Sequence, residues 1–591
     1  MLGAKEYCIR HIFRSFIRWA KFSKHKGGLS KMITRFLVIL ILFSQSYGDT
    51  TIVAFDAVHQ SFGNLGNNRS ITQLIQFPNS NSNYSNIVMN VSLECPDGGC
   101  DPWDRKAKIS IEHLEDWFEI GRYVTPYGVE CGWSFDVTDY RSLLQGEVAL
   151  RSYIDTWVQP GWLVTISFDF ISGVPEHPYT VVRNIWNNDY VVYGDPTNPA
   201  NIPSVTEYIP SDATNAYLRM ITTGHGQGNT ENAAEFSLKI HDIFFNNDLA
   251  YLHNFWRSDC ESNGCSPQNG NWQYDRAGFC PGDKVIPMDF DLMSQVLVGD
   301  TIKFDYVLED YFNQCSPNNP SCTNGVTCSS CDYNNTGHTE PYYYIGSHLI
   351  IHSESYHTNA DAYFRVSELD SENGSINIYM ENYASIYGIQ FAISVDGSEN
   401  VDLNQLFLGN GQGGRAEEYG WTVSTNDSGL VIGMAQFTGN PIPGGEGVLT
   451  QIPINISSLG QSTGQINIID LQVSGYFGSE ITHEIGPPLN YESGLNLDDS
   501  VILPKEHKLL SAYPNPFNPS VNIPFELATQ AHVVLNIYDL KGQKVETLMD
   551  KFLSEGGYET NWNASSYASG VYVCSLESDG WISTTKLILI K

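Results

Sequence analysis

Short runs in which apolar and polar residues alternate constrain the fold of this chain more than any other feature. The stretches AKISIEH, FEIGRYV and WLVTISFDFI, at residues 107–113, 118–124 and 162–171, follow this pattern. Successive side chains of a β-strand point to opposite faces, so alternation predicts strands that bury one face. Long helical periodicity is scarce, whereas glycines and the 33 tyrosines are plentiful. Together these observations predict an all-β protein made of sandwiches with many turns.

Strand runs and turn clusters divide the chain into blocks. Its 591 residues exceed what one hydrophobic core can organise, so several domains are expected. The turn-rich stretch SGVPEHP separates a first strand-rich block, 49–173, from a second, 174–355. A third strand-rich block spans 360–500, and a final one spans 505–591.

The first 48 residues have the pattern of a leader. A short basic lead, MITR, precedes the apolar run FLVILILF, and SYG then offers small residues at the usual cleavage spacing. These features predict a signal peptide at about residues 32–48, with a start codon assigned too far upstream. The apolar run is too short to span a bilayer. We therefore expect an exported mature chain without a membrane span.

Charge and cysteines narrow the environment further. The net charge of -34 argues against nucleic acid or an anionic membrane as a partner. In an oxidising compartment cysteines pair, and Cys95 and Cys100 are close enough to close a small loop. Cys260 and Cys280 are further disulfide candidates. The spacing of a third group also suits zinc, although disulfides are favoured for Cys315, Cys322, Cys328 and Cys331.

The stretch ECPDGGCDPWDR places an acid, Asp104, directly after the small cysteine loop. A closed loop of this size leaves the backbone few options and holds the following residues in position. Trp103 can raise the pKa of Asp104 by excluding water, whereas Arg105 lowers it. Local chemistry leaves two other interpretations open. Asp104 and Arg105 point to opposite faces of a strand without a role, or a calcium site forms from Asp97, Asp101 and Asp104, although its spacing lacks the usual alternation of ligands.

The final block carries a recognisable set of motifs. YPNPFNP at 513–519 is followed by NIPFELATQAHVVLNIYDLKGQKV and by ASGVYVC. This combination resembles the type A C-terminal sorting domains of the type IX secretion system in Bacteroidetes and relatives. The resemblance implies a small Ig-like β domain, a bacterial protein that is secreted or held at the cell surface, and the type IX secretion machinery as a partner. The alternative is an ordinary terminal Ig-like module.

The third block resembles a different kind of sandwich. The stretches YGIQFAISVDG, GWTV and NDSG are similar to parts of cohesin-type sandwiches. The resemblance implies a β-sandwich that can hold a partner module. A spacer between the first two blocks and the sorting domain is the alternative.

The first two blocks resemble the peptide-N-glycosidase F family. ECPDGGCDPWDRKAKISI, FEIGRYVTPYG, LRSYIDTWVQPGW, NAYLRMITTGHGQ, AAEFSLKIHDIFFNN and GNWQYDRAGFCPG occur in the family's order and spacing. The resemblance covers about residues 51–350 and implies two adjacent antiparallel jelly rolls with the active site at their interface. It also implies hydrolysis of the amide between asparagine and the first N-acetylglucosamine of an N-glycan. We expect N-glycoproteins and N-glycopeptides as partners, a monomer, and no metal or other cofactor.

The resemblance assigns roles residue by residue. Asp104 is implied to be the primary acid–base group beside the scissile amide, and Glu235 to position or polarise the linkage. Asp155 stands where the family has a glutamate and is implied to act through water. The residues implied to bind or support the sugar are Arg105, Trp157, Arg276 and Trp103.

Departures from the family pattern leave one alternative open. Ala233 and Ser237 replace a cysteine pair around Glu235, and the stretch around 313–338 is additional. Since Asp155 is one methylene shorter than glutamate, a non-catalytic N-glycan-binding protein on the same scaffold is the alternative function. His348 and His352 share one strand face and suit metal, but no third ligand suggests itself. A structural or surface role is favoured for both.

Overall fold

The computed structural model describes residues 49–591 apart from 64–65, 82, 398–400, 436–439, 460–462, 493–506, 511, 528–530, 540, 542, 554–555 and 579–580. The predicted leader lies outside the described residues. No helix within the described part of the chain is long and apolar enough to cross a membrane. The chain separates into two compact units, with the boundary between Ser493 and Gly494.

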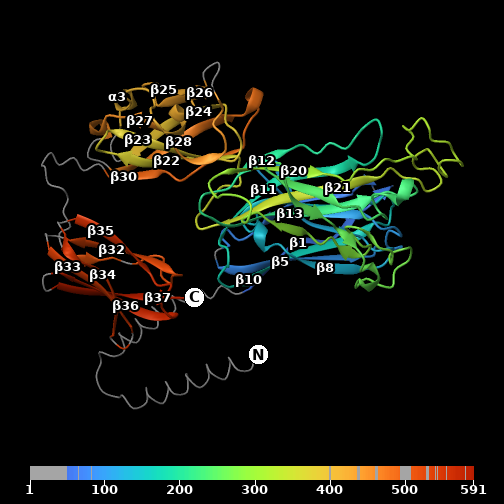
Figure 1. Ribbon diagram of the computed structural model, residues 1–591, viewed down its shortest axis with the longest axis horizontal. Helices are drawn as coiled ribbons and strands as arrows, with labels where there is room; N and C mark the ends of the chain where they lie inside the picture. The colour runs from blue at the N-terminus through green and yellow to red at the C-terminus, as the bar shows by residue number, and fades with distance from the viewer. Residues whose placement is uncertain are drawn as a thin grey trace, which may run out of the picture. The chain divides into compact units, whose positions relative to one another are not determined.

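Two sheets form the first jelly-roll sandwich (Figure 1). One sheet contains, in spatial order, β1 (Thr50–Gln60), β10 (Trp162–Ser172), β5 (Tyr84–Glu94) and β8 (Cys131–Asp136). The other contains β18 (Asp283–Lys284), β7 (Asp116–Val124), β6 (Lys106–His113), β9 (Glu147–Ile154) and β4 (Ser70–Gln76). The alternation predicted for β10 is present, because Trp162, Val164, Ile166, Phe168 and Phe170 are fully buried. A small hairpin is formed by β2 (Phe62–Gly63) and β3 (Gly66–Asn67).

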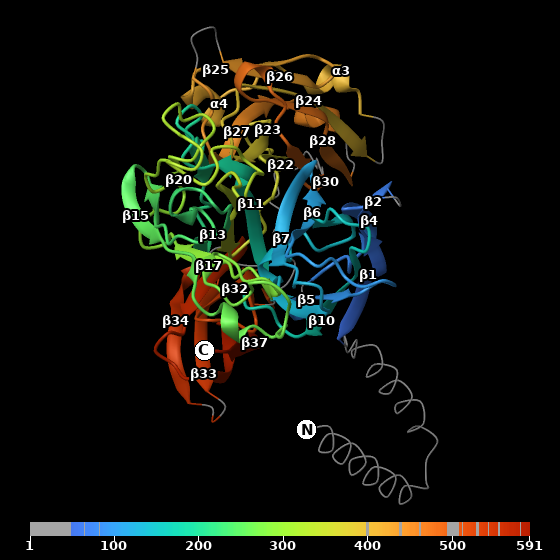
Figure 2. The same cartoon turned by 90° about the vertical axis from the view of Figure 1, so that its right-hand side faces the viewer.

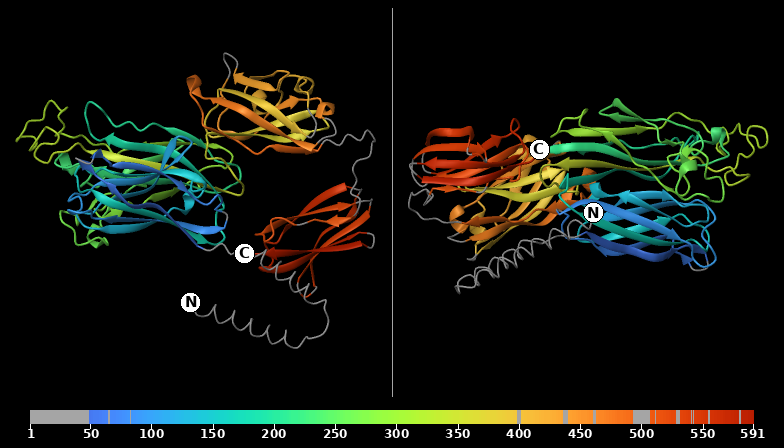
Figure 3. Two further views of the ribbon diagram at one scale, coloured as in Figure 1. Left: turned by 180° about the vertical axis from the view of Figure 1, so that it is seen from behind. Right: turned by 90° about the horizontal axis from the view of Figure 1, so that it is seen from below.

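A second sandwich packs beside the first, as both views of Figure 3 show. Its inner sheet contains β11 (Tyr179–Val192), β21 (Tyr342–Ser353), β13 (Ala213–His225) and β19 (Met288–Asp291). Its outer sheet contains β12 (Val205–Tyr208), β20 (Thr301–Val307), β14 (His241–Phe245) and β15 (Asp248–His253). A separate two-stranded sheet is formed by β16 (Trp256–Arg257) and β17 (Arg276–Ala277).

The inner sheet is buried on both faces. β21 is buried at every position after Tyr342, because one face packs on its own core and Ile350 joins the core of the first sandwich. β6 and β7 lie beside β11 in Figure 2. Arg122 of β7 donates to the carbonyl oxygen of Tyr344 at 2.7 Å. Strand β18 follows the second sandwich's β17 in sequence but extends the first sandwich's sheet, so the two sandwiches are interlocked.

β21 also explains the two histidines on its face. Nδ1 of His348 lies 3.1 Å from the Tyr140 hydroxyl, and Nε2 of His352 lies 3.2 Å from Asp139 Oδ1. Both side chains are buried where the two sandwiches meet. These contacts support the structural role that was favoured for them.

The third block also forms a sandwich of two sheets. One sheet contains β27 (Gly445–Pro453), β23 (Ser375–Asn382), β22 (Ala362–Asp370) and β29 (His483–Ile485). The other contains β25 (Trp421–Thr425), β26 (Leu430–Ala435), β24 (Gly388–Gly397), β28 (Thr463–Ser474) and β30 (Leu489–Glu492). This sandwich also contains two short helices, α3 (Leu403–Leu406) and α4 (Gly414–Glu418), and the 3-10 turns Ile456–Leu459 and Tyr476–Gly478. The 3-10 turns of the first two sandwiches are Thr138–Tyr140, Thr230–Asn232 and Cys260–Ser262.

The residues between the second and third sandwiches pack on both. Arg183 of β11 donates to the carbonyl oxygen of Asn359 at 2.7 Å and forms an ion pair with Asp361. The Asn359 side chain accepts from the Val182 N–H at 2.9 Å. The segment 356–361 is therefore a shared seam within the first compact unit.

The second compact unit is a small sandwich. Its sheets contain β31 (Lys508–Leu509), β32 (Ser520–Leu527) and β35 (Gly556–Asn563), and β34 (Lys544–Leu553), β33 (Ala531–Asp539), β36 (Gly570–Ser578) and β37 (Trp581–Leu589). Trp562 lies fully buried at its centre. Cys574 is buried there as a free thiol.

Disulfides brace the first compact unit. The expected small loop is closed by Cys95–Cys100, and Cys260 pairs with Cys280. A long-range bridge, Cys131–Cys265, joins the first sandwich to a loop of the second. The four cysteines for which a zinc site was the alternative form two disulfides in the described structure, Cys315–Cys328 and Cys322–Cys331. The preference for disulfides at these four positions is confirmed.

Candidate active site

A cleft of about 740 Å³ is walled by both jelly-roll sandwiches. The first sandwich contributes the segment Trp103–Lys106, Tyr127 and Asp155. The second contributes Glu235, Arg276 and aromatic residues of β21 and its neighbours. The cleft therefore brings together acids that are far apart in the sequence.

Asp104 lies between β5 and β6, on a loop that is anchored next to it. The buried Asp101 accepts from Arg105 Nε at 2.7 Å, from the Thr156 hydroxyl at 2.6 Å and from the Trp103 N–H at 3.0 Å. Its own N–H donates to Gly161 at 3.1 Å. These bonds hold the backbone on both sides of Asp104, beyond what the Cys95–Cys100 loop alone provides.

The same contacts bear on two expectations about this loop. Arg105 lines the cleft, and its Nε and Nη2 donate to Asp101, which holds the guanidinium in place; that it binds the sugar stays a prediction. Since Asp101 uses both carboxylate oxygens for these partners, it is not available to a calcium site with Asp97 and Asp104.

The cation closest to Asp104 is Arg276 rather than its sequence neighbour Arg105. Arg276 Nη1 lies 4.0 Å from Asp104 Oδ2. Burial raises the pKa of Asp104, the charge of Arg276 lowers it in part, and Arg105 contributes least. Trp103 is 58% exposed, so its indole alone does not account for the burial of the acid.

Glu235 lies in the loop that follows the 3-10 turn Thr230–Asn232. Its Oε1 forms an ion pair with Arg276 Nη1, and its Oε2 accepts from the Gly226 N–H at 3.2 Å. The Ala277 N–H donates to its backbone oxygen at 2.9 Å, which ties the loop to β17. Burial raises the pKa of Glu235 to about 7; Arg276 opposes this rise and the charge of Asp104 adds to it.

Arg276 is fixed between the two acids. Its side chain is 1% exposed, and Nη2 donates to the backbone oxygen and Oδ1 of Asn271 at 3.0 and 2.9 Å. Tyr127 donates to the same Asn271 Oδ1 at 2.7 Å. One immobile positive charge is thus shared by two carboxyls whose pKa values burial has raised, a setting suited to proton transfer near neutral pH.

Asp155 lines the same cleft and has its own partners. It follows β9 directly and accepts from the Tyr153 hydroxyl at 3.0 Å. Arg69 Nη1 lies 3.5 Å from Oδ1, and Lys106 Nζ lies 3.9 Å from Oδ2. Its carboxylate is therefore held by a different set of groups from the one that holds Asp104 and Glu235.

The side chain of Trp157 is 54% exposed. It does not occur among the described residues that line the cleft. Its ring lies 4.0 Å from the Arg69 guanidinium and packs edge-on against Phe62. Through Arg69 the ring is connected to Asp155 of the cleft, and the expectation that Trp157 contacts substrate stays a prediction.

Several cleft residues were not singled out by their sequence. Tyr127 and Asn271 position Arg276, and Lys106 donates to the Tyr342 hydroxyl at 2.7 Å. Tyr342 stacks against His225 and lies 4.2 Å, ring centre to ring centre, from Tyr190. Burial lowers the pKa of His225 well below its ordinary value, so its ring is neutral. No local motif marks these residues, because they meet only through long-range folding.

The additional stretch around 313–338 also reaches the cleft. Tyr333 and Asn334 line it, followed by Thr339 and Glu340. The two disulfides within this stretch hold a segment that otherwise has little regular structure. This part of the wall is therefore formed by a disulfide-bonded segment, and that the segment is additional to the family pattern stays a prediction.

Comparisons with known proteins place these features in a family. The family model described as Peptide-N-glycosidase F, N terminal, matches residues 108–170. The family model of the C-terminal part matches residues 194–330. A secretion system C-terminal sorting domain matches residues 511–591. Peptide-N(4)-(N-acetyl-beta-D-glucosaminyl)asparagine amidase F of Elizabethkingia miricola is 33% identical over 278 residues, which cover 44% of this chain and 78% of that protein.

Two solved structures align with part of this chain. The structure of PNGase F, a glycosylasparaginase from Flavobacterium meningosepticum, is 28% identical, covers 53% of this chain and 98% of its own, and has a TM-score of 0.46. That of PNGF-II is 16% identical, covers 52% and 66%, and has a TM-score of 0.42. The sequence match to the Elizabethkingia enzyme carries the assignment: this chain belongs to the peptide-N-glycosidase F family.

Proposed function

We propose that this protein is a secreted glycoamidase that hydrolyses the amide bond between asparagine and the first N-acetylglucosamine of N-glycans. The observation that carries the proposal is Arg276, which contacts Glu235 and lies 4.0 Å from Asp104 in a cleft between two sandwiches. The relative of this chain from Elizabethkingia miricola is named for this amidase activity. The products are the glycan, released with the amide nitrogen as its glycosylamine, and a peptide with aspartate in place of asparagine.

The reaction needs an activated water and a proton for the leaving amine. The water oxygen forms a bond to the amide carbon, the carbon–nitrogen bond breaks, and the departing nitrogen takes up a proton. Asp104 acts as the primary acid–base group beside the amide. Glu235, with a pKa of about 7, retains its proton on a large fraction of molecules at neutral pH and polarises the linkage.

Asp155 and Lys106 act from the adjacent wall. Asp155 is one methylene shorter than the glutamate of the family pattern, and we assign it a positioning role through a bound water. Lys106 is placed by Tyr342 and by the charge of Asp155. Tyr190 lines the cleft and is 53% exposed, and its ring with a polar edge suits the face of a sugar ring.

Export follows from the C-terminal domain. Residues 511–591 match a secretion system sorting domain, and we propose that they direct the chain through the type IX system to the outside of the cell. The braced cysteine pairs of the first compact unit suit that oxidising destination.

The test is incubation of the full chain with a defined N-glycopeptide. Release of free glycan, with conversion of the glycosylated asparagine to aspartate, is the expected result. Binding of the glycopeptide without release would contradict the proposal and would identify a glycan-binding protein instead. Chromatography of the peptide, which gains a carboxylate on hydrolysis, separates these outcomes.

A further inference from the structure

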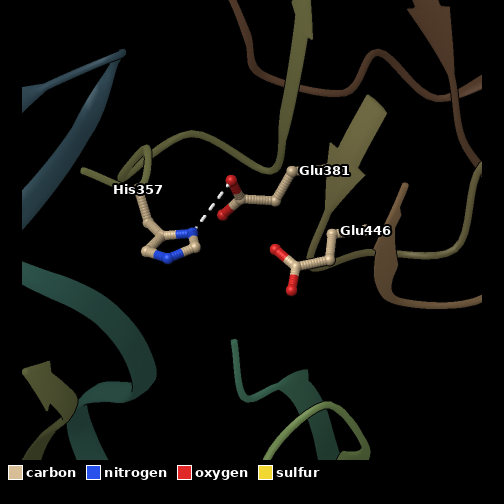
Figure 4. A group of neighbouring side chains, drawn as sticks. All are labelled: His357, Glu381 and Glu446. Carbon is tan, nitrogen blue, oxygen red and sulfur yellow. Dashed lines mark ion pairs between the residues drawn. The ribbon is translucent and has the colours of Figure 1, made fainter. Parts of the chain in front are cut away.

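A second group of titratable side chains lies at the seam between the second and third sandwiches (Figure 4). His357 follows β21. Glu381 is the second-last residue of β23, and Glu446 lies at the start of β27. One ligand-type atom from each lies within 4.8 Å of the others. None of the three lines the catalytic cleft, so this group is independent of the proposed reaction.

Glu381 is the unusual member of this group. The residue is 3% exposed, and its Oε1 has no hydrogen-bond partner. A buried carboxylate without a partner is costly unless it is paired or binds a metal ion.

The imidazole of His357 is oriented by a carboxylate outside the group. Its Nε2 lies 2.7 Å from Asp212 Oδ1, and its Nδ1 lies 3.1 Å from Glu381 Oε2. When Nε2–H donates to Asp212, the lone pair of Nδ1 points toward Glu381. A histidine whose far nitrogen donates to a carboxylate is the usual arrangement around a protein-bound metal.

Two lone pairs that face each other at 3.1 Å require a cation between them. A proton on Nδ1 would satisfy that contact alone. It would leave Glu381 Oε1 unpartnered and set one positive charge against the carboxylates of Asp212, Glu381 and Glu446. Arg415 does not supply the missing charge, because its guanidinium donates to the backbone oxygens of Pro443 and Gly445 and to the Asn382 side chain.

The spacing suits a small divalent ion. Ligands at about 2.0–2.1 Å from a tetrahedral zinc ion stand roughly 3.3 Å apart, close to the separation of Nδ1 and Glu381 Oε2. Figure 4 shows the carboxylates of Glu381 and Glu446 both turned toward the imidazole. Glu446 is itself held, since the N–H and the hydroxyl of Ser211 both donate to its Oε1 and Tyr379 donates to its Oε2 at 3.2 Å, so Oε2 is the oxygen that faces an ion.

We infer that His357 Nδ1, Glu381 and Glu446 form a binding site for a divalent transition-metal ion, with Zn²⁺ favoured by the imidazole and carboxylate ligands. Asp212 orients the histidine, and a water completes the tetrahedron. The glutamates come from the third sandwich and the orienting Asp212 from the second, so the ion fastens the third sandwich to the catalytic half. The additional sandwich is thereby held as part of one rigid unit.

The test uses the full chain, prepared without a polyhistidine tag and stripped with a chelator. Zinc is added, free metal is removed by gel filtration, and bound metal is measured by mass spectrometry. We expect one zinc per chain in the wild type and a raised Tm on addition of zinc. We expect Glu381→Gln and His357→Gln to lose the bound zinc and the rise in Tm. The control His177→Gln, which removes a histidine outside the site, should keep the bound zinc and the rise in Tm.

The wild type decides the inference even if the buried variants fail to fold. Failure of the stripped wild type to retain zinc, or another divalent transition metal added in its place, would overturn it and leave His357 with a proton. Retention of the metal by well-folded His357→Gln or by the less buried Glu446→Gln would also overturn it, because the ion would then be bound elsewhere.

Discussion

Two regions of this molecule each place two carboxylates beside one basic side chain, in different ways. In the cleft, Asp104 and Glu235 share Arg276, whose charge is permanent and whose guanidinium is fixed by Asn271. At the seam, Glu381 and Glu446 surround His357, whose ring can be neutral or charged. The first group opens into a cleft, and the second is enclosed between sandwiches.

The two regions differ in whether the basic side chain can lose its proton. Arginine does not deprotonate, so in the cleft the mobile charge is a proton on one of the acids, as acid–base chemistry requires. A neutral imidazole, unlike a guanidinium, offers a lone pair to a metal. Similar residue types therefore support a reaction in one region and a structural ion in the other.

The largest effect is expected at Asp104. Asp104→Asn keeps size and hydrogen bonding but removes the titratable proton, so kcat on a glycopeptide should fall by roughly 10²–10⁴-fold, the usual share of general acid–base catalysis. Steady-state kinetics measure the loss. Glycan affinity and Tm should change little.

Asp97→Asn is the matched control, since Asp97 is exposed in the same disulfide loop. It should keep wild-type turnover. Near-normal kcat in Asp104→Asn would break the contrast between the two regions and the proposed function with it.

Glu235→Gln should lower kcat by about 10²-fold, at the lower end of that range, because an amide still donates to the linkage but cannot exchange its proton. The pH dependence adds a sharper test. In the wild type, kcat/KM should fall as the pH rises through about 7, because Glu235 then loses the proton with which it polarises the linkage. This fall is the alkaline limb of the pH profile. This limb should be absent in the variant, and its persistence would assign it to another group.

Asp155→Asn should have a smaller effect than either. Its carboxylate is held by Tyr153, Arg69 and Lys106 rather than by Arg276. Loss of a charge-assisted bond worth about 1.5 kcal/mol corresponds to roughly tenfold in rate. A drop in kcat as large as that of Asp104→Asn would instead make Asp155 a direct participant in the reaction.

The smallest effect is expected from removal of the Cys95–Cys100 disulfide by a double substitution to serine. The loop loses its closure but keeps the bonds of Asp101 to Arg105 and Thr156. Turnover should fall several-fold while circular dichroism stays unchanged. Unfolding of the first sandwich would show that the loop supports the fold and not only the acid.

The sequence predicted the strands well because half-buried strands alternate. It also singled out Asp104 and Glu235, through a resemblance that spans both sandwiches. It named Arg105 as the cation that lowers the pKa of Asp104, which is correct, but it missed the larger effect of Arg276, because Arg105 turns to Asp101 whereas Arg276 arrives from another domain. Consecutive residues of an extended chain point to opposite faces, so sequence neighbours are poor guides to contacts.

The seam group could not be predicted for the same reason. His357, Glu381 and Glu446 lie in three separate elements, and their spacing matches no short metal motif. Tyr127 and Asn271 likewise carry no local signal. Only the fold brings their side chains to Arg276.

The most direct test of the central claim is hydrolysis of one N-glycopeptide in water enriched in heavy oxygen, followed by mass spectrometry of the peptide. Two carboxyls in a cleft can cleave either an amide or a glycosidic bond, and the position of the solvent oxygen tells them apart. Amide hydrolysis by Asp104 and Glu235 predicts an aspartate that carries one heavy oxygen. A peptide that keeps its asparagine, with or without a released glycan, would contradict the account.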